Sequence, residues 1–105
     1  MPIIRIVKMS FRPEEIDRFT RMFDERKERI RSFPGCQHLE LWQDEKENNT
    51  FVTYSIWEDE QHLDHYRFST FFKETWGLTK ALFLAKAEAW TLHQRVTGKK
   101  GEEEG

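Results

Sequence analysis

The sequence has 105 residues, with 17 Lys and Arg against 19 Asp and Glu, so its net charge is −2. We expect one domain from this length, and neither nucleic acid nor a membrane as a partner, because a near-neutral chain attracts neither. Cys36 is the single cysteine, which excludes an intramolecular disulfide and favours a reducing, cytoplasmic location. No apolar run exceeds residues 81–85, which is too short for a membrane helix or a signal-peptide core.

Aromatic residues compensate for a modest hydrophobic fraction. Only 37% of the residues are hydrophobic and 34% are charged, but nine Phe, four Trp and two Tyr are present. Each of these side chains buries roughly 150–250 Å² in a folded protein. A small core built from them is feasible.

The first third of the chain predicts a strand followed by a helix. Residues 3–11 alternate as a strand with apolar side chains on both faces. Pro13 followed by two glutamates is typical of a helix start. A stripe at helical spacing then extends for about five turns, with one cation among its apolar members, over Ile16, Phe19, Phe23, Arg26, Ile30 and Phe33. Pro34 and Gly35 end the helix.

The middle and the end of the chain predict a hairpin, two helical pieces and a last strand. Strands at residues 36–43 and 50–58 flank a polar turn and should pair antiparallel. Asp59 can cap a helix that reaches about residue 68, and Ser69 or Thr70 can cap a second piece that reaches about residue 83. Residues 85–94 alternate as a strand. We therefore expect a domain over residues 1–95 and a polar, disordered tail over residues 96–105.

This order of elements predicts an α+β fold of the ferredoxin-like βαββαβ type, an antiparallel sheet with its helices on one face. Three strands nevertheless carry apolar side chains on both faces, in the pairs Val7 and Ile6, Trp57 and Ile56, and Ala87 and Trp90. Because the helices cover only one face of the sheet, the apolar side chains on the other face need a second covering layer. Burial against an identical sheet, at roughly 25 cal/mol per Å² over about 1,000 Å² per subunit, predicts a homodimer through the sheet face.

Several stretches carry a family resemblance. Phe33-Pro34-Gly35-Cys36, the alternating strand up to Trp42, Phe51-Val52 leading to Trp57-Glu58-Asp59, and a helix with Leu63, Ser69 and Phe72 resemble the antibiotic biosynthesis monooxygenase family. The resemblance covers about residues 3–94. It implies a dimeric α/β barrel with a pocket between sheet and helices in each subunit. It also implies oxidation of polycyclic phenols or quinols by dioxygen with no bound cofactor, neither metal nor flavin.

The chain departs from this family at particular positions. Quinol-oxidising relatives carry His where this sequence has Tyr66 and Phe71. Haem-degrading relatives use an Asn on the first strand, a Trp at the position of Tyr66 and a His at that of Trp76, and none of these is present. A shared fold alone does not fix a function.

Cofactor-free oxygenation needs an apolar pocket, a base and hydrogen-bond donors near a phenolate. We expect Tyr66 and His65 to be the catalytic residues, because Tyr66 replaces a family site residue and keeps a hydroxyl. His65 is the candidate base, although it should point about 100° away from Tyr66 on the helix. The expected substrate-binding residues are Trp57, Phe72, Trp76, His38 and Arg26.

Each of these candidates has a simpler interpretation. The aromatic residues fit a plain core, and Arg26 fits a stem that places its head in water. The spacing of His62 and His65 suits a shared metal, but no third ligand is evident and we predict no metal site. Cys36 has no His partner in the sequence, so a nucleophilic role is not expected.

Two functions therefore remain open. One is a cofactor-independent monooxygenase acting on a small aromatic phenol, quinol or polyketide-like substrate. The other is a non-catalytic homodimeric module of the same fold, either binding a small aromatic ligand or serving a structural role. RNA-recognition domains share this order of elements, but residues 50–58 contain no Gly, Lys or Arg and so lack their basic motif.

Overall fold

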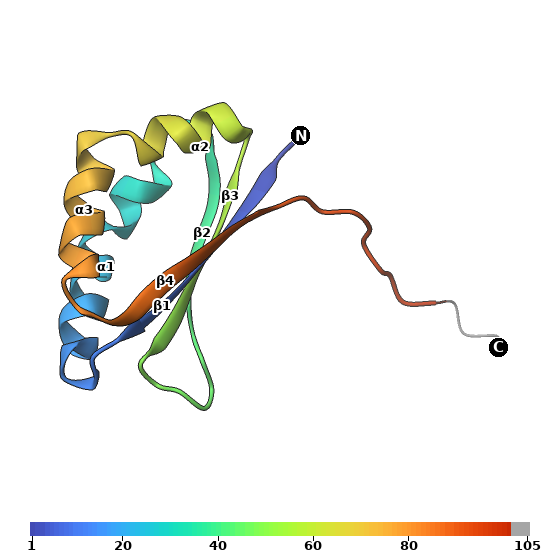
Figure 1. Ribbon diagram of the computed structural model, residues 1–105. Coiled ribbons are helices and arrows are strands. Elements are labelled where there is room, and N and C mark those ends of the chain that lie inside the picture. The colour runs from blue at the N-terminus through green and yellow to red at the C-terminus, as the bar shows by residue number, and fades with distance from the viewer. Residues whose placement is uncertain (102–105) are drawn as a thin grey trace.

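A computed structural model describes residues 1–101 of the chain. The elements in chain order are β1 (Ile3–Phe11), the 3-10 turn η1 (Pro13–Glu15), α1 (Ile16–Arg31), β2 (Cys36–Gln43), β3 (Thr50–Trp57), α2 (Glu60–Arg67), α3 (Thr70–Lys80) and β4 (Phe83–Leu92). Residues 93–101 lead away from the sheet without regular structure (Figure 1). The rest of the predicted tail, residues 102–105, lies outside the described residues.

The four strands form one antiparallel sheet in the order β2-β3-β1-β4. The helices lie together on one face of this sheet, and the other face carries none of them (Figure 1). The predicted ferredoxin-like α+β fold is confirmed. Within residues 1–101, no helix has both the length and the apolar character needed to cross a membrane.

The helix starts follow the local sequence. The Asp59 side chain accepts a hydrogen bond from the backbone N–H of His62 at 2.9 Å, and the Ser69 hydroxyl accepts one from Phe72 N–H at 3.0 Å. These caps satisfy donors that the first helical turn leaves free, as predicted for both positions. The first helix differs from the prediction, because η1 precedes α1 where one continuous helix was expected.

The last helix and strand both end earlier than the sequence predicted. Helix α3 stops at Lys80 instead of about residue 83, and β4 spans residues 83–92 instead of 85–94. Two long-range contacts decide this: Phe83 pairs with Phe11 in the sheet, and the backbone N–H of Arg12 donates to Leu82 O at 3.0 Å. At its other end β4 pairs up to Leu92, because its partner strand β1 begins at Ile3.

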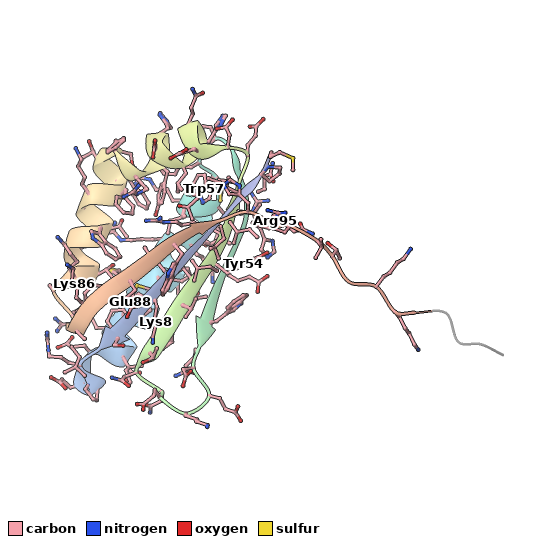
Figure 2. The ribbon with its side chains drawn as sticks, turned by 45° about the vertical axis from the view of Figure 1, so that its right-hand side comes forward. Lys8, Tyr54, Trp57, Lys86, Glu88 and Arg95 are labelled. Atoms are coloured by element: carbon pink, nitrogen blue, oxygen red, sulfur yellow. The ribbon has the colours of Figure 1, made fainter. Side chains whose placement is uncertain are left out.

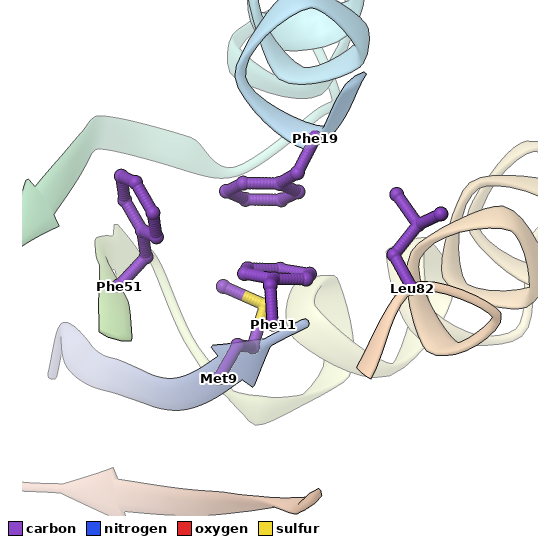
Figure 3. Packing of buried hydrophobic residues seen from close by; sticks show 5 residues of the cluster. All are labelled: Met9, Phe11, Phe19, Phe51 and Leu82. Atoms are coloured by element: carbon purple, nitrogen blue, oxygen red, sulfur yellow. The ribbon is translucent and has the colours of Figure 1, made fainter. Parts of the chain in front are cut away.

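Two buried clusters join the sheet to the helices. In the larger cluster, Phe11 stacks on Phe19 with ring centroids 4.0 Å apart, and Met9, Phe51 and Leu82 surround the pair (Figure 3). The smaller cluster joins Ile3, Cys36, Trp57 and Leu63 at the end of the sheet nearest α2. The space between these two clusters is not filled, and the candidate functional site lies there.

The helix-free face, here called the open face, carries apolar residues. Alternation places Ile6 and Tyr54 opposite each other on this face, and Trp90 pairs with Ile6 from the other side. Trp90 is 42% exposed and Leu92 is 45% exposed. Figure 2 labels Tyr54 together with Lys8 and Glu88, which pair with each other across β1 and β4. The expected two-sided apolar pattern of the strands is therefore present.

Candidate functional site

A cavity of about 380 Å³ lies between the sheet and the helices. This volume falls in the range of small-molecule sites, roughly 300–1,000 Å³. The sheet lines it with Arg5, Val7, Met9, Leu39, Thr53, Ser55, Trp57, Ala87 and Ala89. Helix α1 contributes Phe19, Met22, Phe23, Arg26 and Ile30, and α2 and α3 contribute Leu63, Tyr66, Arg67, Phe72, Thr75, Trp76 and Thr79.

Four aromatic rings form one continuous wall of this cavity. Trp57, at the end of β3, stacks on Tyr66 of α2 with centroids 5.0 Å apart. Tyr66 meets Phe72 edge-on at 5.0 Å, and Phe72 stacks on Trp76 at 6.0 Å. Phe72 and Trp76 face the same side because they are one helical turn apart on α3. Aromatic walls of this kind bind planar rings well.

Tyr66 combines buried ring contacts with a hydroxyl that has no protein partner. The Ser69 hydroxyl donates to the backbone carbonyl of Tyr66 at 2.6 Å, but the Tyr66 hydroxyl itself makes no hydrogen bond to another residue of 1–101. No buried side-chain nitrogen or oxygen in this part of the chain lacks a partner. The hydroxyl is therefore accessible, on a residue that lines the cavity. Burial is the main cause, and the Cys36 thiol a smaller one, of a pKa for Tyr66 raised well above its usual value. A raised pKa favours the protonated hydroxyl, which can donate a hydrogen bond.

Ser55 and Trp57 supply a second polar point in the cavity. The indole Nε1–H of Trp57 donates to the Ser55 hydroxyl oxygen at 3.0 Å, and both residues are buried. This bond satisfies the indole and fixes its plane against Tyr66. The hydroxyl proton of Ser55 is not used in that bond, so it is available to an acceptor in the cavity.

Arg26 occupies the stripe position of α1 that the sequence singled out. Its guanidinium donates to the Thr75 hydroxyl at 2.8 Å and lies 3.4 Å from the Glu74 carboxylate, so it ties α1 to α3. It also lies over the ring of Phe71, 5.6 Å from the centroid. Its side chain is 22% exposed, so most of it is buried, while its contact with Glu74 lies at the protein surface. Arg26 lines the cavity with its charge already partly neutralised.

Two further cations line the cavity, and the sequence analysis did not propose them. Arg5 lies on the helix-facing side of β1, between Ile3 and Val7, and Arg67 ends α2. The signal for Arg5 was present: it is the single charge on the core-facing side of its strand, whose other members are Ile3, Val7, Met9 and Phe11. The signal for Arg67 was absent, because a cation in the last turn of a helix is ordinary.

The structure brings five of the seven proposed site residues together. Trp57, Tyr66, Phe72, Trp76 and Arg26 all line the cavity. His65 is instead an exposed residue of α2 that contacts the ring of Phe33. His38 lies on the open face, where its ring nitrogen contacts Glu40 and its ring meets Tyr54. The two histidines are outside the cavity because the helix turn and the strand alternation point them elsewhere.

The cavity has no obvious proton acceptor. Among residues 1–101, the side chains that line it include no Asp, Glu or His. His62 lies in the first turn of α2, outside the cavity, where its Nδ1 is 2.7 Å from Asp59 and its Nε2 is 3.6 Å from Glu58. In the same described part of the chain, no group of three metal-binding side chains converges. The polar groups in the cavity are hydroxyls and guanidiniums, which stabilise an anion.

Comparison with known proteins identifies relatives in sequence and in fold. The chain is 27% identical over 73 residues to an uncharacterised protein of Synechocystis sp., and it spans about half the length of that relative. A crystal structure of an antibiotic biosynthesis monooxygenase superposes with a TM-score of 0.84 at 23% identity, covering 90% of this chain and 99% of that one.

Two other solved structures share the fold. A conserved protein from Methanosarcina mazei Go1 has a TM-score of 0.86 at 21% identity, over 90% of this chain and 94% of its own. A mutant of SnoaB, a cofactor-independent oxygenase from Streptomyces nogalater, has a TM-score of 0.82 at 16% identity, over 91% and 95% of the two chains. A sequence profile of the antibiotic biosynthesis monooxygenase family matches residues 2–76. Because that match covers most of the chain, this protein belongs to the antibiotic biosynthesis monooxygenase family.

Proposed function

We propose that this protein is a cofactor-independent monooxygenase that oxidises a small aromatic phenol, quinol or polyketide-like substrate with dioxygen. The observation that carries the proposal is a continuous aromatic wall with an unpartnered Tyr66 hydroxyl in a cavity whose charged groups, among residues 1–101, are all cationic. Family membership supports it, as does the fold shared with a cofactor-independent oxygenase.

The reaction requires an anion, because a phenolate gives an electron to dioxygen far more readily than a phenol does. The phenol loses its proton to solvent water. One electron then passes from the phenolate to dioxygen, the resulting radical pair combines to form a peroxide anion on a ring carbon, and this anion takes a proton from water. Loss of water from that peroxide, with the hydrogen of the same carbon, leaves one oxygen atom as a carbonyl. A phenol and dioxygen thus give a quinone and water, and the substrate supplies all the electrons.

The cavity residues have distinct parts in this scheme. Tyr66 donates a hydrogen bond to the substrate oxyanion, and the Arg26 guanidinium, which also lines the cavity, lowers the pKa of the bound phenol by favouring its anion. Trp57, Phe72 and Trp76 hold the ring plane and exclude water. His65 and His38 have no part in it, because neither lines the cavity.

Oxygen consumption tests the proposal. Purified full-length protein, treated with a chelator, is assayed against naphthols, naphthohydroquinones and anthrones, with a protein-free blank for autoxidation. We expect at least one substrate to consume oxygen faster than its blank, with ¹⁸O from ¹⁸O₂ in the product. Tyr66→Phe should slow this reaction, whereas Tyr54→Phe on the open face should not. Rates equal to the blank throughout the panel would overturn the proposal.

A second function has its own supporting observation. The absence of a carboxylate or an imidazole among the described cavity residues favours a non-catalytic module that binds a small aromatic ligand in the same cavity. The two functions separate in one experiment, because a binding module would bind members of the panel without consuming oxygen.

We also propose that the protein is a homodimer through the open face, as a dimeric α/β barrel. Trp42, Trp90 and Leu92 are each more than 40% exposed on this face, and Ile6, Tyr54 and Ile56 are only half-buried. Burial against a second copy would remove these side chains from water.

A further inference from the structure

The charged groups in the cavity are not evenly distributed. Arg26 has a carboxylate partner, Glu74, at 3.4 Å. Arg67 is held only by Asp64, at 3.9 Å, within residues 1–101, and the two side chains are 41% and 42% exposed. Arg5 donates to the hydroxyl of Thr91 at 2.9 Å, and no carboxylate in the same described stretch lies within ion-pair distance of it.

The sheet register places Arg5 and Arg67 at the same end of the cavity. Arg5 of β1 pairs with Ser55 of β3, Trp57 two residues further along β3 stacks on Tyr66, and Arg67 follows Tyr66 at the end of α2. Both arginines line the cavity, and the charge of Arg67, after the effect of burial, is a cause of the lowered pKa of Arg5. The carboxylate of Asp64 acts in the opposite direction on the same group. Two guanidiniums against one carboxylate leave an excess of one positive charge at this end of the cavity.

An excess positive charge beside an apolar cavity carries an electrostatic cost that an anionic ligand reduces. A guanidinium binds a carboxylate through two parallel N–H donors, and it does so more strongly in a partly desolvated site. Because Arg67 is exposed, this end of the cavity reaches solvent, so the anionic end of a ligand can remain near water while its rings enter. The excess of one charge matches a monoanion better than a dianion such as a phosphate monoester.

We propose that the cavity recognises an aromatic carboxylate, with the carboxylate at Arg5 and Arg67 and the rings against the wall formed by Trp57, Tyr66 and Phe72. This inference rests on the proposed function, because it takes the ligand to be the substrate of that reaction. The phenol or quinol would carry a carboxylate on the side opposite its reacting oxygen. The ring would then lie where the Tyr66 hydroxyl can reach that oxygen.

A probe that is not readily oxidised can test binding without turnover. Its binding therefore tests this inference independently of the proposed function. Isothermal titration calorimetry of the full chain compares 1-naphthoate with 1-naphthalenemethanol, which has the same rings and no charge. We expect 1-naphthoate to bind roughly 10-fold more tightly or better, since a charge-assisted bond contributes at least that much. The preference should weaken as salt is raised.

Two variants assign the preference to this end of the cavity. Arg5→Gln and Arg67→Gln should each reduce the affinity for 1-naphthoate and leave that for 1-naphthalenemethanol within about two-fold, because the aromatic wall is unchanged. Arg21→Gln, an exposed cation of α1 outside the cavity, is the matched control and should change neither affinity. Arg67 lies on the helix surface, so its variant reports on binding even where Arg5→Gln lowers the melting temperature.

The outcomes are distinct. Equal affinity for the acid and the alcohol, or a preference that Arg67→Gln leaves intact, would overturn the carboxylate site. A carboxylate preference without oxygen consumption against the panel would keep the site and assign it to a binding module. If substrates with and without a carboxylate consumed oxygen at the same rate, the proposed function would stand and this inference would be overturned.

Discussion

At the scale of single residues, the environment of a side chain decides its chemistry more than its type does. Tyr66 and His65 are neighbours in the sequence, but the helix turns one into the cavity and leaves the other in solvent. Burial holds the pKa of Tyr66 above its usual range, so its hydroxyl keeps its proton at physiological pH. His65, whose imidazole could act as a base, therefore lies outside the cavity, and Tyr66, whose hydroxyl can donate a hydrogen bond, lines it.

Tyr66→Phe tests the role of that hydroxyl. Because the hydroxyl is accessible and has no hydrogen-bond partner among residues 1–101, and because the ring volume is kept, we expect a melting temperature within about 2 °C of the wild type. Turnover should fall by about 10²-fold, as is usual for loss of a positioned donor. A thermal melt and an oxygen electrode on the same preparation measure both. A lowered melting temperature with unchanged turnover would make Tyr66 a structural residue.

At the scale of elements, the connection between α1 and β2 depends on a single glycine. Gly35 has φ of +83°, a left-handed conformation that other residues rarely adopt. A Cβ built there would lie 2.4 Å from Cβ of His62, so the turn after α1 packs directly on α2. The peptide N–H of Glu58 also donates to Gly35 O at 2.8 Å, which ties the same turn to the end of β3.

We expect Gly35→Ala to destabilise the protein by about 2 kcal/mol or more, from the left-handed backbone and the contact with His62 together. Gly77→Ala is the matched control. Gly77 lies within α3, and a methyl group at its Cα would meet nothing within 4 Å, so alanine there should stabilise the helix by roughly 0.5–1 kcal/mol. Urea unfolding measures both changes. A destabilisation by Gly35→Ala no larger than a few tenths of a kcal/mol would contradict the packing of this turn on α2.

The first turn of α2 predicts a pH dependence. The Asp59 carboxylate raises the pKa of His62 by a hydrogen bond to its Nδ1, while the backbone N–H of His62 is the main cause of a lowered pKa for Asp59. A raised pKa in the folded state stabilises fully below the unfolded value of about 6.5 and is lost as pH rises through the folded pKa. Above about pH 5 the Asp59 carboxylate is ionised in both states, so it adds no further pH dependence there.

Wild type should therefore exceed His62→Gln in melting temperature by more at pH 5.5 than at pH 8.5. Differential scanning calorimetry at the two pH values measures this. His65→Gln, on the same helix and without a carboxylate within ion-pair distance in the described part of the chain, is the control. A wild-type advantage that is equal at both pH values would show that the Asp59–His62 contact does not contribute to stability.

At the scale of the whole molecule, one face of the sheet remains uncovered. The helices pack on the side of Phe11 and Trp57, and the open face presents Ile6 and Tyr54 between two half-exposed tryptophans, Trp42 and Trp90. Large apolar faces of this kind on a small domain are typical of an interface between subunits. The predicted dimer depends on this face alone, and not on the cavity.

Light scattering at micromolar concentration tests the dimer. We expect a mass twice that of the 12.8 kDa chain for the wild type. Ile6→Glu should shift the protein toward the monomer, because Ile6 lies between Tyr54 and Trp90 and a buried carboxylate at that point is costly. Val96→Glu, at a position that is 88% exposed beyond the sheet, should leave the mass unchanged. A monomeric wild type would remove the dimeric barrel.

Several elements of the fold could be predicted from the sequence without the structure. The strands at residues 3–11 and 36–43, the caps at Asp59 and Ser69, and the apolar pattern on both faces of the sheet are local features, and local periodicity and hydrogen bonding are sufficient to specify them. The aromatic members of the site follow from the same patterns, since Trp57 ends a strand and Phe72 and Trp76 share a helix face.

Which polar side chains line the same end of the cavity depends on the tertiary structure. Arg5 and Arg67 share one end of the cavity because β1 lies between β3 and β4 and α2 packs near the end of that sheet, an arrangement that no local pattern encodes. The start of β4 at Phe83 was also decided there, through its pairing with Phe11. Periodicity predicts the face of a strand or helix on which a side chain lies. The neighbours of that side chain depend on strand order and register, which are set by contacts between distant parts of the chain.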